Sequence, residues 1–241
     1  MSQIKANTSF IYIAALICLL AVGLFMFTKS DFFMLQEVRI EGLENVAEEE
    51  IVKLLGTVKG QNLFLTDTKA LAQRVKLHPL VNEAAVRKEL PLTLVVDIQE
   101  RIPVALILNE DGVVEVDKEG TILRFHETWP KTGSPVVTGV VVPDTIGPGQ
   151  KLVSKQLDKV LLLLGQASPS MIPLIGEVNI NEVGQVFLFL NTGMEVRLGH
   201  DEEYAGKLNL LNELIYNEEY KSIEKSIKYI DLTAGKPVLG R

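Results

Sequence analysis

The sequence predicts an α+β protein with a single N-terminal transmembrane helix, a small strand–helix–helix–strand–strand domain, and a mostly antiparallel β domain with two helices. Three observations predict it: an uncharged apolar run near the N-terminus, period-two and helical patterns alternating along the rest, and a change at Pro103 to mostly short strands. The expected divisions are a stub (1–9), a membrane span (10–28), a connector (29–35) and domains at 36–103 and 104–241.

The apolar run covers residues 10–27 and contains no charged side chain. As a helix it would be about 27 Å long, close to the ~30 Å hydrocarbon core of a bilayer. A cleaved signal peptide is the alternative, but this run is longer than the usual ~7–15 apolar residues and ends in bulky Phe25-Met26-Phe27. We therefore expect an uncleaved anchor. Lys5 before the span and Lys29 after it give each flank one positive side chain. The terminal amine on the first flank and Asp31 on the second therefore make the N-terminal flank the more positive one, which favours a cytoplasmic N-terminus.

The first domain opens with Glu37–Gly42, where apolar and charged residues alternate as in a half-buried strand. Apolar residues at helical spacing predict a helix over 47–55, with three glutamates in its first turn. A second helix should begin after a cap at Thr66 or Asp67 and end before Pro79. Two further strands are expected at 81–89 and 93–101.

The second domain shows short strand patterns separated by turn residues such as Asp117–Gly120 and Asn109–Gly112. One helix should run from about Val153 to near Pro169, and another from Asp201 to Asn217. The expected strands are 104–109, 113–117, 121–125, 136–142, 178–180, 185–190, 194–198, 226–233 and 237–239.

Composition excludes several classes of function. The net charge of −7 and the lack of a Lys/Arg cluster argue against nucleic-acid binding. The single cysteine, Cys18, lies inside the apolar run, so the remaining chain has no disulfide, thiol nucleophile or cysteine metal site.

No catalytic, cofactor-binding or metal-binding set is predicted. The histidines at 78, 126 and 200 are far apart in sequence, and the glycine-rich stretch 147–151 lacks the spacing of a phosphate loop. The acidic stretch after His200 is typical of a helix start. Glu100 and Arg101 are expected to form a salt bridge at the domain boundary.

Eight short motifs follow one another along the chain: Val38–Gly42, Gly60–Leu63, Pro79–Val86, Leu90–Leu94, Glu100–Ala105, Val116–Gly120, Thr192–Gly199 and Tyr229–Val238. In this order they resemble the FtsQ/DivIB cell-division proteins, which carry a POTRA domain after a membrane anchor. Each motif is short, but together they cover nearly the whole chain. Two features differ from the family pattern: Ala47 stands where a Ser or Thr cap is usual, and the N-terminal tail is short.

This resemblance implies a non-catalytic bitopic scaffold of the divisome in the inner (plasma) membrane at the septum, with FtsB- and FtsL-like (DivIC) partners. A late edge strand could accept a partner strand by β-augmentation. The candidate residues are Lys228, Tyr229, Ile230, Asp231, Leu232 and Thr233, with Tyr229 as the aromatic anchor; a strand fully paired in its own sheet is the alternative. A second candidate edge comprises Val81, Ala84, Val86 and Arg87.

Other classes predict different features. An outer-membrane transporter would carry a barrel of alternating strands after the POTRA domain, and a membrane-anchored enzyme would show a convergent polar cluster. A membrane-anchored ligand-binding or sensor protein remains the alternative to a scaffold.

Overall fold

The computed structural model describes residues 8–109, 112–130, 132–200, 202–234 and 236–240. Most of the expected stub, two residues of the turn at 109–112, and the expected helix start at Asp201 lie outside this part. The chain divides into two compact units, Met1–Glu100 and Arg101–Arg241, which are described separately.

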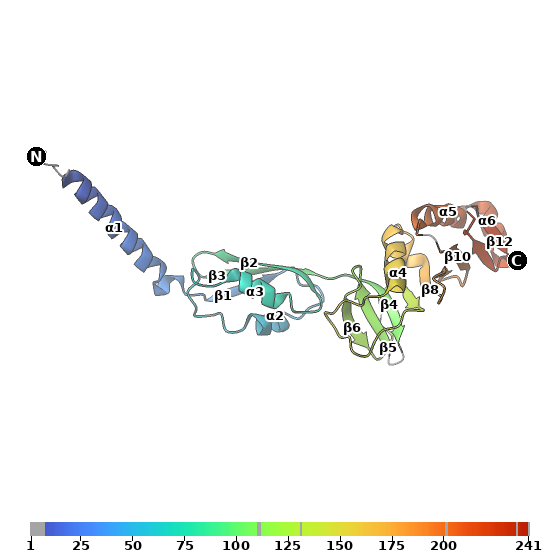
Figure 1. The fold of residues 1–241 in the computed structure, drawn as a ribbon, viewed down its shortest axis with the longest axis horizontal. Coiled ribbons are helices and arrows are strands. Elements are labelled where there is room, and N and C mark those ends of the chain that lie inside the picture. Colours follow the sequence, from blue (N-terminus) through green and yellow to red (C-terminus); the bar gives the residue numbers. More distant parts are fainter. Residues whose placement is uncertain (1–7, 110–111, 131, 201, 235, 241) are drawn as a thin grey trace, which may run out of the picture. The chain divides into compact units, whose positions relative to one another are not determined.

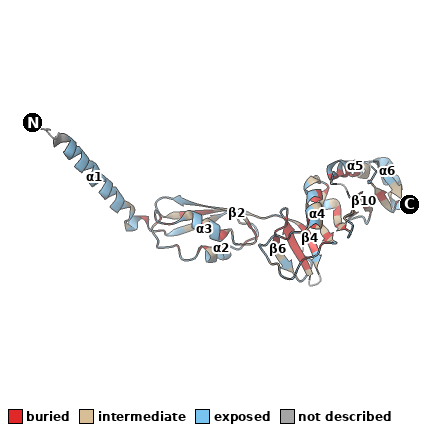
Figure 2. Ribbon diagram, viewed as in Figure 1, coloured by how far each residue is buried: buried red, intermediate tan, exposed pale blue. Residues whose placement is uncertain are grey.

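Helix α1 (Thr8–Thr28) opens the first unit (Figure 1). Its residues Phe10–Thr28 make it the one helix in the described ranges that is long and apolar enough to cross a membrane. Figure 2 shows it exposed along its length, and none of this span is buried against protein. An apolar helix with no protein cover is suited to lipid.

The remainder of the first unit has the expected order: β1 (Glu37–Glu41), α2 (Glu48–Leu55), α3 (Thr68–Val75), β2 (Val81–Glu89) and β3 (Thr93–Glu100). The strands form a sheet in the order β1-β3-β2, with β1 parallel and β2 antiparallel to β3. Asp67, rather than Thr66, caps α3 by accepting from the N–H groups of Lys69 and Ala70. Ala47 occupies the α2 cap position and makes no side-chain cap bond.

Residues 31–35, assigned to the connector in the sequence analysis, make backbone contacts with the α2–α3 loop (residues 56–67). The short 3₁₀ helix η1 (Asp31–Phe33) follows α1. Leu35 N–H donates to the Gln61 carbonyl at 2.8 Å, and Leu63 N–H donates to the Phe33 carbonyl at 2.8 Å. The chain is therefore fixed to the first unit before β1 begins.

The second unit contains a nine-stranded sheet in the order β12-β11-β10-β9-β8-β7-β4-β5-β6. Five of its eight pairings are antiparallel, which agrees with the expected mostly antiparallel domain. β7 is shorter than the predicted strand at 136–142. The strands are β4 (Pro103–Asn109), β5 (Gly112–Asp117), β6 (Ile122–His126), β7 (Val136–Thr138), β8 (Ile175–Ile180), β9 (Val186–Leu190), β10 (Glu195–Gly199), β11 (Tyr229–Asp231) and β12 (Val238–Gly240).

In the described residues of this unit, three α-helices accompany the sheet, rather than the two predicted: α4 (Lys155–Gln166), α5 (Tyr204–Tyr216) and α6 (Glu218–Ile223). Asn217 ends α5 and caps α6, because its side chain accepts from the N–H groups of Glu219 and Tyr220. The 3₁₀ helices η2 (Ile172–Leu174) and η3 (Glu224–Ser226) precede β8 and β11. The strands and the three α-helices contribute to one apolar core.

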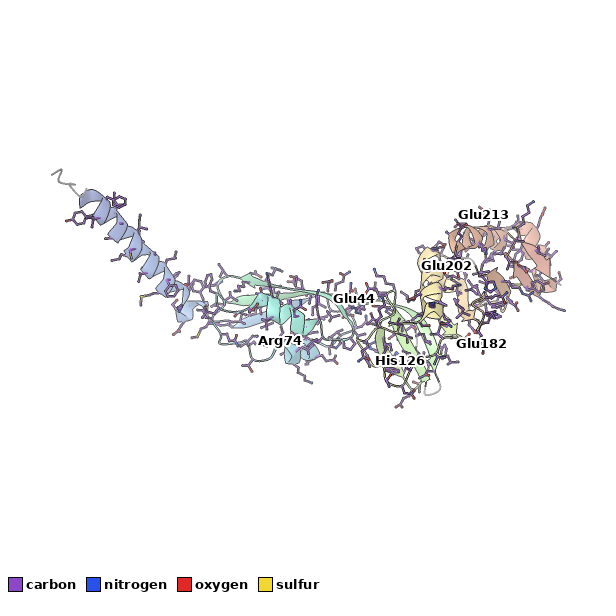
Figure 3. All side chains as sticks on the ribbon, in the orientation of Figure 1. Glu44, Arg74, His126, Glu182, Glu202 and Glu213 are labelled. Atoms are coloured by element: carbon purple, nitrogen blue, oxygen red, sulfur yellow. The ribbon has the colours of Figure 1, made fainter. Side chains whose placement is uncertain are left out.

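Glu100 and Arg101 do not pair with each other, so the expected boundary salt bridge was wrong. The Glu100 carboxylate accepts the N–H groups of Glu44, Asn45 and Val46 at 2.8–2.9 Å (Glu44 is labelled in Figure 3). Arg101 instead pairs with the buried Asp117 of the second unit. Each residue thus stabilises its own unit.

Hydrogen bonding shifts the titration of Glu100. Burial acts to raise the pKa of Glu100, but the N–H groups of Glu44, Val46 and Asn45 outweigh it and hold that pKa below the usual value. The ionised carboxylate is therefore the form that stabilises the loop before α2.

Candidate partner-binding edge

The large sheet ends in β12 on one side and in β6 on the other, so the edge near the C-terminus is β12 and not the predicted candidate at 226–233. β11 lies inside the sheet, parallel to β10 on one side and antiparallel to β12 on the other. The expectation that β11 is a free edge was therefore wrong, because the three residues of β12 cover it. Among the strands of the described residues, β12 has a neighbour on one side only.

The candidate residues of β11 divide between two faces. Ile230 and Leu232 are fully buried and belong to the core. Tyr229 and Asp231 are half-buried on the opposite face. Lys228 and Thr233 flank the strand and are exposed. The six residues that the sequence placed in one partner surface therefore do not share one face, because Ile230 and Leu232 face away from solvent.

The outer face of β10 and β11 carries a polar cluster around Arg197. Its guanidinium lies 3.8 Å from the ring centroid of Tyr229, and its Nε donates to Glu195 Oε1 at 2.7 Å. The hydrogen bond to Glu195 is the largest cause of the raised pKa of Arg197. Asp231 Oδ1 accepts from Thr233 Oγ1 at 2.6 Å and Thr233 N–H at 2.9 Å, bonds that lower the pKa of Asp231.

Gly240 lets the Tyr229 ring lie over β12. The two residues are directly opposite across the β11–β12 pair, and a Cβ on Gly240 would stand 2.1 Å from Tyr229 Cε1. The ring occupies the space that any larger residue at 240 would need. Tyr229 therefore extends across the last strand toward the edge.

The side chains of β12 itself differ in exposure. Val238 is 54% exposed, whereas Leu239 is half-buried and packs against the core. This alternation fixes β12 to the sheet through one side chain and leaves another at the surface. The sequence analysis predicted a strand at 237–239 but did not assign it the edge. Val238 and Leu239 are both apolar, so the sequence carries no signal of which one is exposed.

The second candidate, β2, does lie at an edge of its three-stranded sheet. Val81 is buried, and Ala84 and Val86 are half-buried. Arg87 is on the solvent side, where its Nε donates to Asp97 Oδ2 at 3.0 Å. This hydrogen bond is the largest cause of the raised pKa of Arg87. Arg87 also pairs with Glu41 at 3.3 Å. Charged groups along an edge strand oppose unspecific strand pairing.

The residues weighed for other chemistry make structural contacts. His78 Nε2 lies 2.7 Å from Glu50 Oε2, and its Nδ1 accepts from Leu80 N–H at 3.3 Å. His126 Nε2 lies 3.3 Å from Glu115 Oε2. In the described part of the chain, no group of three or more His, Cys, Asp or Glu residues could hold a metal ion.

Two family models match the chain. The first describes a POTRA domain of FtsQ type and matches residues 33–101; the second describes the C-terminal domain of cell division protein FtsQ/DivIB and matches residues 105–233. The chain belongs to the FtsQ/DivIB family. The first unit thus contains the POTRA domain that the resemblance of its motifs implied, and the edge strand β12 lies just beyond the second match.

Relatives support this assignment along most of the chain. Cell division protein FtsQ of Syntrophotalea carbinolica is 28% identical over 234 residues, covering 94% of this chain and 81% of the relative. FtsQ of Myxococcus fulvus is 31% identical over 180 residues, covering 72% of this chain and 61% of the relative. Cell division protein DivIB of Clostridium botulinum is 23% identical over 229 residues, covering 92% and 87%. These similarities support a role in cell division.

Proposed function

We propose that this chain is a non-catalytic scaffold of the divisome that holds FtsB- and FtsL-like (DivIC) proteins at the septum. Its helix α1 spans the inner membrane once, with the N-terminus in the cytoplasm, and the POTRA domain and the second unit outside. The family assignment and the apolar α1 support this placement. No part of this role requires a catalytic group.

The observation that carries the proposal is the position of β12 at the end of a nine-stranded sheet. An edge strand presents a row of backbone N–H and C=O groups that an extended segment of a partner can pair with. β12 is short, and its residue Val238 is apolar and exposed. A partner strand could thus extend the sheet by one member.

Tyr229 gives this edge an aromatic contact. Neighbouring strands lie about 4.8 Å apart, so a strand paired with β12 is two spacings from β11. Side chains of β11 would ordinarily be too distant, but Gly240 lets the Tyr229 ring cross β12. An amphipathic ring at the centre of an interface is a frequent energetic hot spot. Lys228 and Thr233 would contact the partner from the flanks, and the buried Ile230 and Leu232 would support the strand.

The β2 edge of the POTRA domain is proposed as a separate surface for other divisome components. Its residues Val81, Ala84, Val86 and Arg87 border an unpaired strand side. The ion pairs of Arg87 with Asp97 and Glu41 would favour a partner of complementary charge.

A fluorescent fusion to the complete chain tests the scaffold role. The proposal expects a band at mid-cell that persists when only α1 is replaced by an unrelated single span. Uniform envelope fluorescence of the intact fusion contradicts septal placement. A band lost on replacing α1 would assign the recruiting function to the helix instead of the POTRA domain and the second unit.

A further inference from the structure

Four aromatic rings join the end of α1 to the POTRA domain. The Phe33 ring centroid lies 5.1 Å from that of Phe27 in α1, 5.0 Å from Phe32 and 4.8 Å from Phe64 in the α2–α3 loop. Phe33 is buried at the centre of the group. Only two ring contacts therefore separate Phe64 from the last turns of the apolar helix.

Backbone contacts fix the same loop to the helix end. Asn62 Nδ2 donates to the Thr28 carbonyl at 2.9 Å, which satisfies a carbonyl that the end of α1 leaves free. Residues Met34 and Asn62 also form an isolated β-bridge. The loop is thus held at the level where α1 would leave the hydrocarbon core.

Large apolar side chains remain exposed at this end of the domain. Phe32 is 58% exposed, Leu65 is 69% exposed, and Phe64 is also exposed. Leu90, also exposed, lies in the β2–β3 turn, at the sheet end where β1 begins, since Gln36 N–H donates to the Leu92 carbonyl. Single exposed apolar residues are common, whereas a group beside a membrane span is typical of an interfacial contact.

We propose that Phe32, Phe64, Leu65 and Leu90 form a membrane-docking surface that enters the headgroup region of the bilayer that α1 spans. The inference rests on the proposed membrane insertion of α1. The occupant is lipid, because the surface is continuous with the end of α1 through Phe27 and Thr28. A group at that end lies within the headgroup layer, which is about 5–8 Å thick on each side of the hydrocarbon core. Docking holds the POTRA domain in one orientation against the bilayer and limits the directions in which its β2 edge is presented.

Tryptophan fluorescence of the full chain in phosphatidylcholine vesicles tests this surface. In a Trp129→Phe background, one tryptophan is placed at a time: Leu65→Trp reports the surface, Leu24→Trp reports α1, and Leu77→Trp is the control. Leu77 is 74% exposed, and Leu65 is comparably exposed. Leu77 lies shortly before Val81, at the end of β2 far from the Leu90 turn, so it should not reach the bilayer. All three positions are exposed, so the substitutions leave the core intact.

We expect a blue-shifted spectrum for Leu65→Trp and a loss of roughly half its intensity with lipids brominated near the headgroup, as for side chains about 5–10 Å into the interface. Leu77→Trp should show neither effect, and lipids brominated near the chain ends should quench Leu24→Trp. Quenching at Leu24 without quenching at Leu65 overturns the docking surface and leaves the anchor intact. A blue shift at Leu65 without lipid quenching indicates a protein contact and also overturns it. Absence of quenching at Leu24 overturns both the docking surface and the proposed anchor.

Discussion

Gly240 lies beneath the aromatic ring of Tyr229, opposite it in the β11–β12 pair. A Cβ at residue 240 would approach Tyr229 Cε1 to 2.1 Å. The last strand of the sheet therefore stays in place only if residue 240 has no side chain or the ring moves. This relationship links the aromatic candidate predicted from sequence to the edge found in the structure.

The first prediction concerns this contact. Gly240→Ala should detach β12 or displace the Tyr229 ring, at a cost of about 1–3 kcal/mol for overpacking. Hydrogen exchange at Val238–Gly240 in the full chain should then be faster than in the unsubstituted protein. The double variant Tyr229→Ala/Gly240→Ala should exchange more slowly than Gly240→Ala, because the clash is gone. Equal exchange in both variants would contradict a steric role for the ring.

The second prediction uses Glu100. Because its pKa is lowered in the folded protein, its stabilisation is present above the ordinary glutamate value of about 4.3 and is lost as the pH falls through the lowered one. At neutral pH, Glu100→Gln should speed amide exchange at residues 44–46 about fivefold, equivalent to about 1 kcal/mol for partly exposed bonds. The difference should vanish below the lowered pKa. Glu89→Gln, at the other end of the sheet, is the matched control and should leave these amides unchanged. A difference that persists in acid argues against the carboxylate.

The third prediction separates two ways of binding a strand: addition to β12, or displacement of β12 and pairing with β11. Asp231 and Val238 are directly opposite, and antiparallel partners at about 4.5–5.5 Å between Cα atoms can be joined by a disulfide. The pair Asp231→Cys/Val238→Cys in a Cys18→Ser background should bind an FtsB-like partner equally well oxidised and reduced. Binding that appears only after reduction would show that β12 must leave.

The POTRA domain was predictable because its signals are local. The alternation at Glu37–Glu41, the acidic first turn of α2 and the Asp67 cap each depend on residues adjacent in sequence. The sequence also left Thr66 and Asp67 as alternatives, and only the folded geometry shows which side chain reaches the N–H groups.

The edge was not predictable in the same way. Which strand ends a sheet depends on pairings between distant segments, here β10, β11 and β12, and strand patterns alone do not give their order. The sequence therefore predicted strands at 226–233 and 237–239, but not that the second pairs with the first and forms the edge of the sheet. Likewise, the helix predicted to end at Asn217 does end there, but no helix was expected at 218–223. The short α6 begins at once because the Asn217 side chain caps it.

The affinity of a Val238→Lys variant for an FtsB-like partner tests the central claim most directly. A lysine on an edge strand opposes strand addition, and we expect at least a tenfold loss, or about 1.4 kcal/mol. Phe125→Lys on β6, the opposite edge of the same sheet and also exposed, is the matched control and should bind normally. Unchanged binding by Val238→Lys, or equal losses in both variants, would contradict partner addition at β12.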